Sequence, residues 1–262
     1  MPLHRLELDG LILLQSPALL AAGAPHAFTT RGGGLSAPPF DTLNLGRATG
    51  DDPAAVRANQ ERVCRALGFG LPALRLVHQV HGCHLLAADQ AGEADGELWP
   101  EADGLLLSEP GRLALVRTAD CLPLLLARAD GRAAAAVHAG WRGLAAGIVP
   151  RAVAALARQA GCRPGDLCAA VGPAIGPAAY EVGPEVAAAF DPAFRRPGAD
   201  AGGRAHLDLQ AAAAAQLAAA GVAVIDVAEE CTWSQPELFF SHRRDGARTG
   251  RQGAVIACRA RP

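Results

Sequence analysis

Residues 118–144 read TADCLPLLLARADGRAAAAVHAGWRGL, and this stretch decides the fold. It contains two apolar runs of strand length, residues 122–127 and 133–137. Continuous apolar runs of this length are typical of strands that are covered on both faces. The stretch therefore predicts two buried strands, with the metal-competent side chains Cys121 and His138 inside or beside them.

Further short elements extend outward from this stretch in both directions. Asp52 and Pro53 suit the start of a helix over 51–67, and Pro150 must start, kink or interrupt a second helix over 144–159. Further helices are expected over 185–190 and 207–220, and further strands over 3–14, 74–87, 105–108, 113–116, 168–171, 222–227 and 253–258. Because no regular βαβ period is visible, we predict an α+β fold. It would form one domain, residues 1–262, with mixed β-sheets flanked by helices.

Composition excludes several classes of function. The net charge of −2 gives no electrostatic reason to expect nucleic acid or an anionic membrane as a partner. All 24 basic residues are arginine, which excludes a lysine Schiff base and a P-loop lysine. The seven cysteines are odd in number and form no CxxC pair, so a reducing compartment, the cytoplasm, is expected. The apolar N-terminal patch is broken by residues 15–17, so neither a signal peptide nor a membrane span is expected.

Three segments place metal-competent side chains in or beside apolar runs: HQVHG (78–82), TADCLP (118–123) and VHAGWRG (137–143). Neutral histidine and cysteine thiolate are good ligands of zinc and copper, and three protein ligands with one open position are typical of catalytic zinc. His81, Cys121 and His138 are separated by 40 and 17 residues, which is too wide for a zinc finger and suits ligands on separate strands. The alternative is a core cysteine beside two hydrogen-bonded histidines.

Strand alternation ranks the other histidines of the first segment. If residues 74–87 form one strand, His78 and His84 lie on the face opposite His81. Both are therefore weaker ligand candidates.

A series of motifs then runs along nearly the whole chain. They are TTRGGGLS (29–36), TLNLGRATGDDP (42–53), HQVHG (78–82), ADGLLL (102–107), TADCLPLLL (118–126), AAVHAGWRGL (135–144), VGPAIGPAAYEVG (171–183) and FFSHRRDGARTGR (239–251). In this order they resemble the laccase-domain, or YfiH-type, family. Its members carry the older name multicopper polyphenol oxidase and the newer name purine nucleoside phosphorylase.

The resemblance implies a YfiH-like layered α/β fold and a catalytic metal held by His81, Cys121 and His138. It implies zinc as the metal, with copper possible, and purine nucleosides and phosphate as small-molecule substrates. The implied reaction converts adenosine, inosine or S-methyl-5′-thioadenosine and phosphate into the free base and ribose 1-phosphate, with adenosine deamination in addition. No obligate protein partner is inferred.

Phosphorolysis requires an anion site, and Arg31 in its glycine-rich loop is the first candidate for a catalytic phosphate contact. Arg142, next to Trp141, is the second candidate. A third group lies near the C-terminus and contains Arg243, Arg244 and Arg251. An arginine run is more commonly a solvated face or a set of ion pairs.

Amide and carboxylate side chains complete the candidate site. Asn44 and Gln79 are candidates for hydrogen bonds to the base or ribose, and Arg142 is counted with them as substrate-binding. Asp120 adjoins Cys121, so it either orients a ligand histidine or caps a turn.

Three alternatives to the phosphorylase remain open. In the first, Cys121 is a nucleophile activated by His138 in a hydrolase that edits peptidoglycan precursors. The second is a copper polyphenol oxidase, which is disfavoured because the chain has no His-x-His pair and its only methionine is Met1. The third is an accessory protein with a structural metal, which would require a fourth protein ligand.

Overall fold

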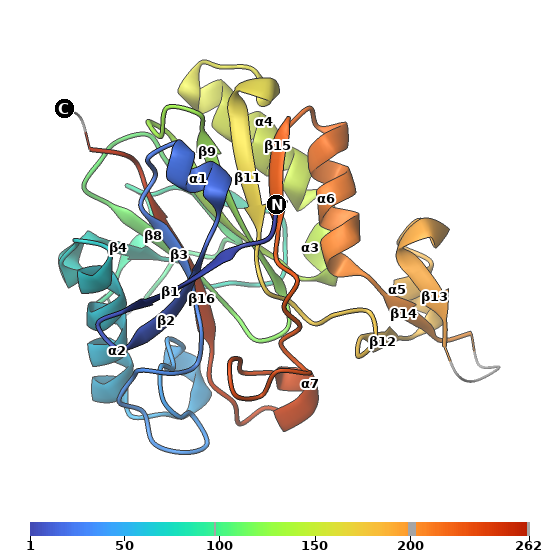
Figure 1. The fold of residues 1–262 in the computed structure, drawn as a ribbon, viewed down its shortest axis with the longest axis horizontal. Helices are drawn as coiled ribbons and strands as arrows, with labels where there is room; N and C mark the ends of the chain where they lie inside the picture. Colours follow the sequence, from blue (N-terminus) through green and yellow to red (C-terminus); the bar gives the residue numbers. More distant parts are fainter. Residues whose placement is uncertain (97, 199–202, 261–262) are drawn as a thin grey trace.

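The computed structural model describes residues 1–96, 98–198 and 203–260. Two large mixed β-sheets pack face to face in the centre of the molecule, and helices cover their outer faces (Figure 1). The α+β class and the mixed sheets flanked by helices are therefore confirmed.

The first sheet has seven strands. From one edge to the other they are β1 (His4–Leu8), β2 (Leu11–Gln15), β3 (His26–Thr29), β16 (Gln252–Ala257), β8 (Leu113–Thr118), β4 (Leu74–Leu76) and β6 (Gly92–Glu93). All pairings in it are antiparallel except that between β4 and β8.

The second sheet has six strands, and a third, three-stranded sheet extends from the body of the molecule beside helix α5 (Figure 1). The six-stranded sheet has the order β15 (Val224–Val227), β11 (Leu167–Val171), β9 (Leu122–Arg128), β10 (Ala134–Ala139), β7 (Gly104–Leu107) and β5 (Leu85–Ala87). The small sheet has the order β12 (Glu181–Val182), β14 (Ala205–Leu207) and β13 (Arg195–Pro197).

Among the described residues, seven α-helices connect and cover the sheets. They are α1 (Pro17–Ala21), α2 (Pro53–Ala66), α3 (Trp141–Ala145), α4 (Ile148–Ala160), α5 (Pro184–Ala187), α6 (Leu209–Ala219) and α7 (His242–Asp245). Helix α2 covers the outer face of the seven-stranded sheet, whereas α3, α4 and α6 cover the six-stranded sheet. No helix in the described part of the chain is both long enough and apolar enough to cross a bilayer.

The central strands are buried on both faces, which explains their continuous apolar sequences. In β9, Leu122, Leu124 and Leu126 contact the helix-side core, while Leu125 and Ala127 contact the opposite sheet. Between the sheets many core side chains are alanines, which lets the two backbones approach closely: Ala114, Ala127, Ala134, Ala136, Ala170 and Ala254.

Several elements begin where the sequence predicts. Asp52 caps α2 by accepting a hydrogen bond from the backbone of Ala54, and Pro53 opens the helix. The helix predicted over 144–159 is divided: α3 ends at Ala145, and α4 starts after Gly147, with Pro150 in its first turn.

Two predicted strands are wrong as continuous elements. The segment 3–14 forms a hairpin of β1 and β2, because Asp9 and Gly10 both have positive φ and turn the chain. The segment 74–87 forms β4 and β5 in different sheets, with a loop between them. The strand-face argument for His78 and His84 therefore has no basis.

A buried contact joins the two sheets near the ends of strands β3 and β11. The ring of Phe28 from β3 lies against Gly172, which follows β11, and a methyl group on that glycine would also lie 2.8 Å from Pro123 Cγ. Phe28 is buried, so its ring cannot move out into solvent to relieve such a contact.

We expect Gly172→Ala to destabilise the protein by about 1–3 kcal/mol, because an added methyl overpacks a rigid contact between the sheets. Gly32→Ala is the matched control, since nothing lies within 4 Å of its Cβ position. Urea unfolding of both variants measures the difference. Equal midpoints would show that the Phe28 contact is not tightly packed.

Candidate active site

Two of the three predicted metal ligands lie on loops that cross between the sheets. The loop 77–84 leads from β4 in the seven-stranded sheet to β5 in the six-stranded sheet, and it contains His81. The loop 119–121 makes the same crossing from β8 to β9 and contains Cys121. His138 lies on the adjacent strand β10. We call 77–84 and 119–121 the crossing loops.

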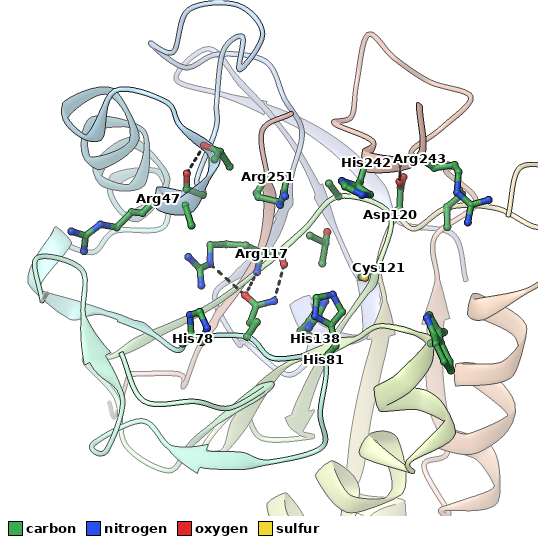
Figure 2. A pocket seen from close by; sticks show the side chains of 18 of the residues that line it. Arg47, His78, His81, Arg117, Asp120, Cys121, His138, His242, Arg243 and Arg251 are labelled. Atoms are coloured by element: carbon green, nitrogen blue, oxygen red, sulfur yellow. Dashed lines mark hydrogen bonds between the residues drawn. The ribbon is translucent and has the colours of Figure 1, made fainter. Parts of the chain in front are cut away.

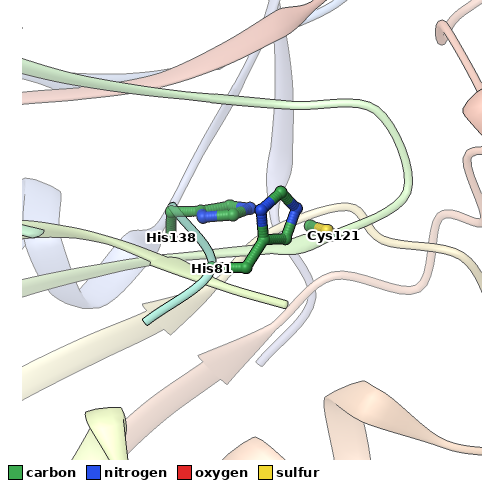
Figure 3. Close-up of side chains that lie close together, drawn as sticks. All are labelled: His81, Cys121 and His138. Atoms are coloured by element: carbon green, nitrogen blue, oxygen red, sulfur yellow. The ribbon is translucent and has the colours of Figure 1, made fainter. Parts of the chain in front are cut away.

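The structure brings His81, Cys121 and His138 together (Figure 3). Their ligand atoms all lie within 4.8 Å of one another, and the two imidazole rings are nearly perpendicular, at 81°. Gly140 leaves room for this arrangement, because a methyl group there would lie 3.0 Å from His81 and 3.2 Å from the Cys121 Sγ. Two imidazoles and one thiolate are a suitable donor set for zinc.

A buried carboxylate orients the side chain of His138 and holds the backbone of His81. Asp103 Oδ1 lies 2.8 Å from His138 Nδ1 and accepts a 2.9 Å hydrogen bond from the backbone N–H of His81. Its Oδ2 accepts a 2.6 Å hydrogen bond from the N–H of Gly82. With Nδ1 bonded to a carboxylate, His138 presents Nε2 to the site, as metal-binding histidines commonly do.

The charges within the group reinforce one another. Burial raises the pKa of Cys121, but His138 and His81 outweigh it and lower that pKa to about 6. Burial lowers the pKa of His138, but Asp103 and Cys121 outweigh it and raise that pKa to about 9. In the metal-free protein at neutral pH, the thiolate and imidazolium forms therefore support each other. A thiolate at neutral pH is also what a metal requires.

The three side chains open into a pocket of about 880 Å³, a size suited to a small-molecule substrate (Figure 2). Aromatic side chains line parts of its wall: Trp99, Trp141 and Tyr180. Four arginines also line it: Arg47, Arg117, Arg243 and Arg251. The pocket therefore combines a metal-competent group with aromatic and cationic surface.

Residues 25–259 match the family described as multi-copper polyphenol oxidoreductase laccase. The chain belongs to this laccase family. It is 43% identical over 248 residues to a protein of Deinococcus radiodurans named purine nucleoside phosphorylase, covering 94% of this chain and 93% of that protein. It is 39% identical over 240 residues to purine nucleoside phosphorylase YfiH of Escherichia coli, covering 89% and 93% of the two chains.

A solved structure agrees with the fold of this laccase-family chain. The crystal structure of YlmD from Geobacillus stearothermophilus superposes with a TM-score of 0.88 at 35% sequence identity, covering 97% of this chain and 98% of that one. The sequence resemblance to the YfiH-type, laccase-domain family is thus confirmed.

The two amides expected to bind substrate support arginines instead. Asn44 is fully buried: its Oδ1 accepts hydrogen bonds from the backbone N–H groups of Gly46 and Arg251, and its amide group donates within the same loop. Gln79 lines the pocket, but its Oε1 accepts from both the backbone and the Nε of Arg117. Asn44 therefore has no atom available for a substrate.

Arg31 and Arg142, the first and second candidates for the phosphate contact, lie outside the pocket lining. Arg31 donates from Nε to the backbone oxygen of Asp41, pairs through another nitrogen with the Asp41 carboxylate at 3.2 Å, and stacks over Phe240. Arg142 is exposed and stacks over Trp141. The Arg31 guanidinium is therefore occupied by protein contacts, whereas that of Arg142 lies on the surface.

Asp120 does not orient a ligand histidine, although it adjoins Cys121. Its φ of 85° turns its side chain toward the C-terminal segment. There it accepts hydrogen bonds of 2.6 Å from the Thr232 hydroxyl and from the backbone of Arg243. The orienting role falls to Asp103, which sequence reasoning missed although the ADGLLL motif at 102–107 contains it.

We expect Asp103→Asn to weaken the binding of a metal such as zinc about 10–100-fold, because an amide has one accepting oxygen, whereas Asp103 accepts through Oδ1 from His138 and His81 and through Oδ2 from Gly82. Asp120→Asn is the matched control: the same chemical change, beside a ligand in sequence but not bonded to one. Competitive zinc titration with a chromophoric chelator measures both affinities. A larger loss in Asp120→Asn would reverse this assignment.

Proposed function

We propose that this protein is a zinc-dependent purine nucleoside phosphorylase. The observation that supports it most is the group of His81, Cys121 and His138 at the wall of an 880 Å³ pocket, in a chain whose relatives are named purine nucleoside phosphorylases. The proposed substrates are phosphate and adenosine, inosine or S-methyl-5′-thioadenosine. The products are the free base and ribose 1-phosphate, and adenosine deamination is proposed as an additional activity.

The donor set fits zinc better than the chemistry of a laccase. Zinc held by three protein ligands keeps an open position, at which it supplies Lewis acidity and lowers the pKa of water to about 7. A laccase needs several coppers to collect electrons for dioxygen, whereas the described residues contain a single group of three or more metal-competent side chains. Copper at the same three ligands remains a weaker alternative.

The chain's own residues would bind and position the reactants. Asp103 keeps the Nδ1 proton of His138 in place, so that Nε2 faces the pocket. Trp141 and Tyr180 line the pocket, and their flat faces suit a purine ring. Burial is the largest influence on Tyr180 and raises its pKa to about 12, so its hydroxyl stays protonated and can donate a hydrogen bond.

We also propose a cytoplasmic location, where the cysteines would remain reduced. All seven are free in the structure. The reaction needs only small-molecule substrates, so no protein, nucleic-acid or membrane partner is proposed.

Zinc-loaded protein given inosine and phosphate is expected to release hypoxanthine and ribose 1-phosphate, which chromatography and a ribose 1-phosphate assay detect. Cys121→Ser should lose zinc and lower turnover by at least about 100-fold, because a ligand is removed. Cys162→Ser, a free cysteine away from the pocket lining, is the control and should keep both. A wild-type protein that never forms ribose 1-phosphate is not a phosphorylase.

A second candidate function has a specific observation in its favour. Cys121, His138 and Asp103 follow one another in the order nucleophile, base and orienting carboxylate. This arrangement suits a cysteine hydrolase, for which amide bonds of peptidoglycan precursors are the proposed substrates. The hydrolase would work without metal, whereas the phosphorylase would require it.

The pH dependence of Cys121 alkylation in metal-free protein tests the thiolate. Because the pKa is lowered to about 6, reaction with iodoacetamide should reach half its maximal rate near pH 6 and stay level above pH 7. His138→Gln should move the midpoint upward, since it removes the main stabilising partner. Mass spectrometry of the Cys121 peptide measures the rate, and a midpoint near pH 9 in wild type would contradict it.

Zinc separates the two functions in the same experiment. Under the phosphorylase proposal, zinc protects Cys121 from alkylation and turnover appears only in zinc-loaded protein. Metal-free protein that is active and loses its activity on alkylation of Cys121 would favour the hydrolase.

A further inference from the structure

The pocket contains a second set of polar side chains with unused hydrogen-bonding capacity, apart from the metal-competent group. Arg117 and Thr118 end strand β8, and Arg251 precedes strand β16. In the β8–β16 ladder Thr118 pairs with Gln252, so Arg251 lies next to the end of β8. Figure 2 shows Arg117 and Arg251 in the same part of the pocket, with Cys121, His81 and His138 nearby.

Neither guanidinium meets a carboxylate. Arg117 donates to the backbone oxygen of Val77 at 2.7 Å and to Gln79, and Arg251 donates to the backbone oxygens of Thr249 and Gly250. Neither forms an ion pair with any acidic residue in the described chain. Two positive charges in a partly buried wall without a counter-ion are costly unless an anion joins them.

Burial and neighbouring charges shift the pKa of both arginines. Burial and then the charges of Arg251 and Arg47 lower the pKa of Arg117 to about 10. Burial also lowers the pKa of Arg251, and the negative charges of Cys121 and Asp120 oppose that shift. Arg251 therefore lies within electrostatic range of both Arg117 and the metal-competent group.

Thr118 supplies an independent observation. Its side chain is 2% exposed and lines the pocket, yet its hydroxyl has no hydrogen-bond partner among the described residues. A buried hydroxyl without a partner costs about 1–3 kcal/mol, so such groups are rare unless a ligand or water meets them.

We infer that Arg117, Arg251 and Thr118 form a binding site for a phosphate dianion. The arginines supply two positive charges and forked N–H donors, and the threonine hydroxyl supplies a third donor. Gln79 and the backbone contact of Arg251 with Asn44 hold the two arginines in place. The assignment of this anion as the attacking inorganic phosphate rests on the proposed function.

Thr118→Val is the most selective variant. It removes only a hydroxyl that bonds to nothing in the protein, so folding stability should be unchanged or slightly higher. Binding of inorganic phosphate, followed by calorimetry at constant ionic strength, should weaken at least about tenfold. Arg251→Gln should weaken it at least as much, and Arg248→Gln, an exposed arginine outside the pocket lining, is the charge-matched control and should have no effect.

The inference is overturned if wild type binds neither inorganic phosphate nor adenosine 5′-monophosphate, or if Thr118→Val and Arg251→Gln bind both as well as Arg248→Gln does. A parallel titration with adenosine 5′-monophosphate identifies the source of the phosphate. If only the nucleotide binds, and its binding requires Thr118 and Arg251, the anion site is supported and phosphorolysis is not. If the protein catalyses phosphorolysis but the KM for phosphate is unchanged in Thr118→Val and Arg251→Gln, the proposed function is supported and the proposed phosphate site is overturned.

Discussion

The site depends on the buried carboxylate of Asp103. Burial works against its charge, yet hydrogen bonds from His138 and from backbone N–H groups keep its pKa below the usual range. One side chain thereby fixes two elements at once: strand β10, through His138, and the crossing loop 77–84, through its backbone. His81 holds an unfavourable backbone φ of 60°, which is maintained because neighbouring contacts determine the loop.

The packing of the sheets explains why His81, Cys121 and His138 meet. Alanines between the sheets keep the two backbones close, so the crossing loop 119–121 needs only three residues to pass from β8 to β9. Both crossing loops reach the same edge of the sandwich, where β10 also ends. Three metal-competent side chains that lie far apart in sequence are thus held by rigid strands on either side, which is the support that a preorganised metal site would need.

The sequence predicts the buried strands well because strands covered on both faces are apolar throughout, as residues 122–127 and 133–137 are. It predicts the three metal-competent residues mainly through the ordered motifs, since spacing alone allows a core cysteine equally well. Prediction from sequence fails where tertiary contacts determine the path of the backbone or the partner of a side chain. Strand periodicity cannot show that 78–84 leaves the sheet, and proximity in sequence favours Asp120 over Asp103 although the backbone turns Asp120 away from the histidines.

Hydrogen-bond saturation separates supporting residues from those that meet a ligand, and sequence cannot show it. Asn44 and Gln79 look like substrate contacts by residue type, but their oxygens are occupied by the backbone or side chains of Arg251 and Arg117. The pocket side chains that can still meet a ligand are a thiolate with two histidines, and two arginines with a threonine whose hydroxyl has no partner among the described residues. A metal satisfies the first set and an oxyanion satisfies the second. The proposed phosphorylase would use both, whereas a metal-free cysteine hydrolase would require the arginines only if its substrate were itself an anion.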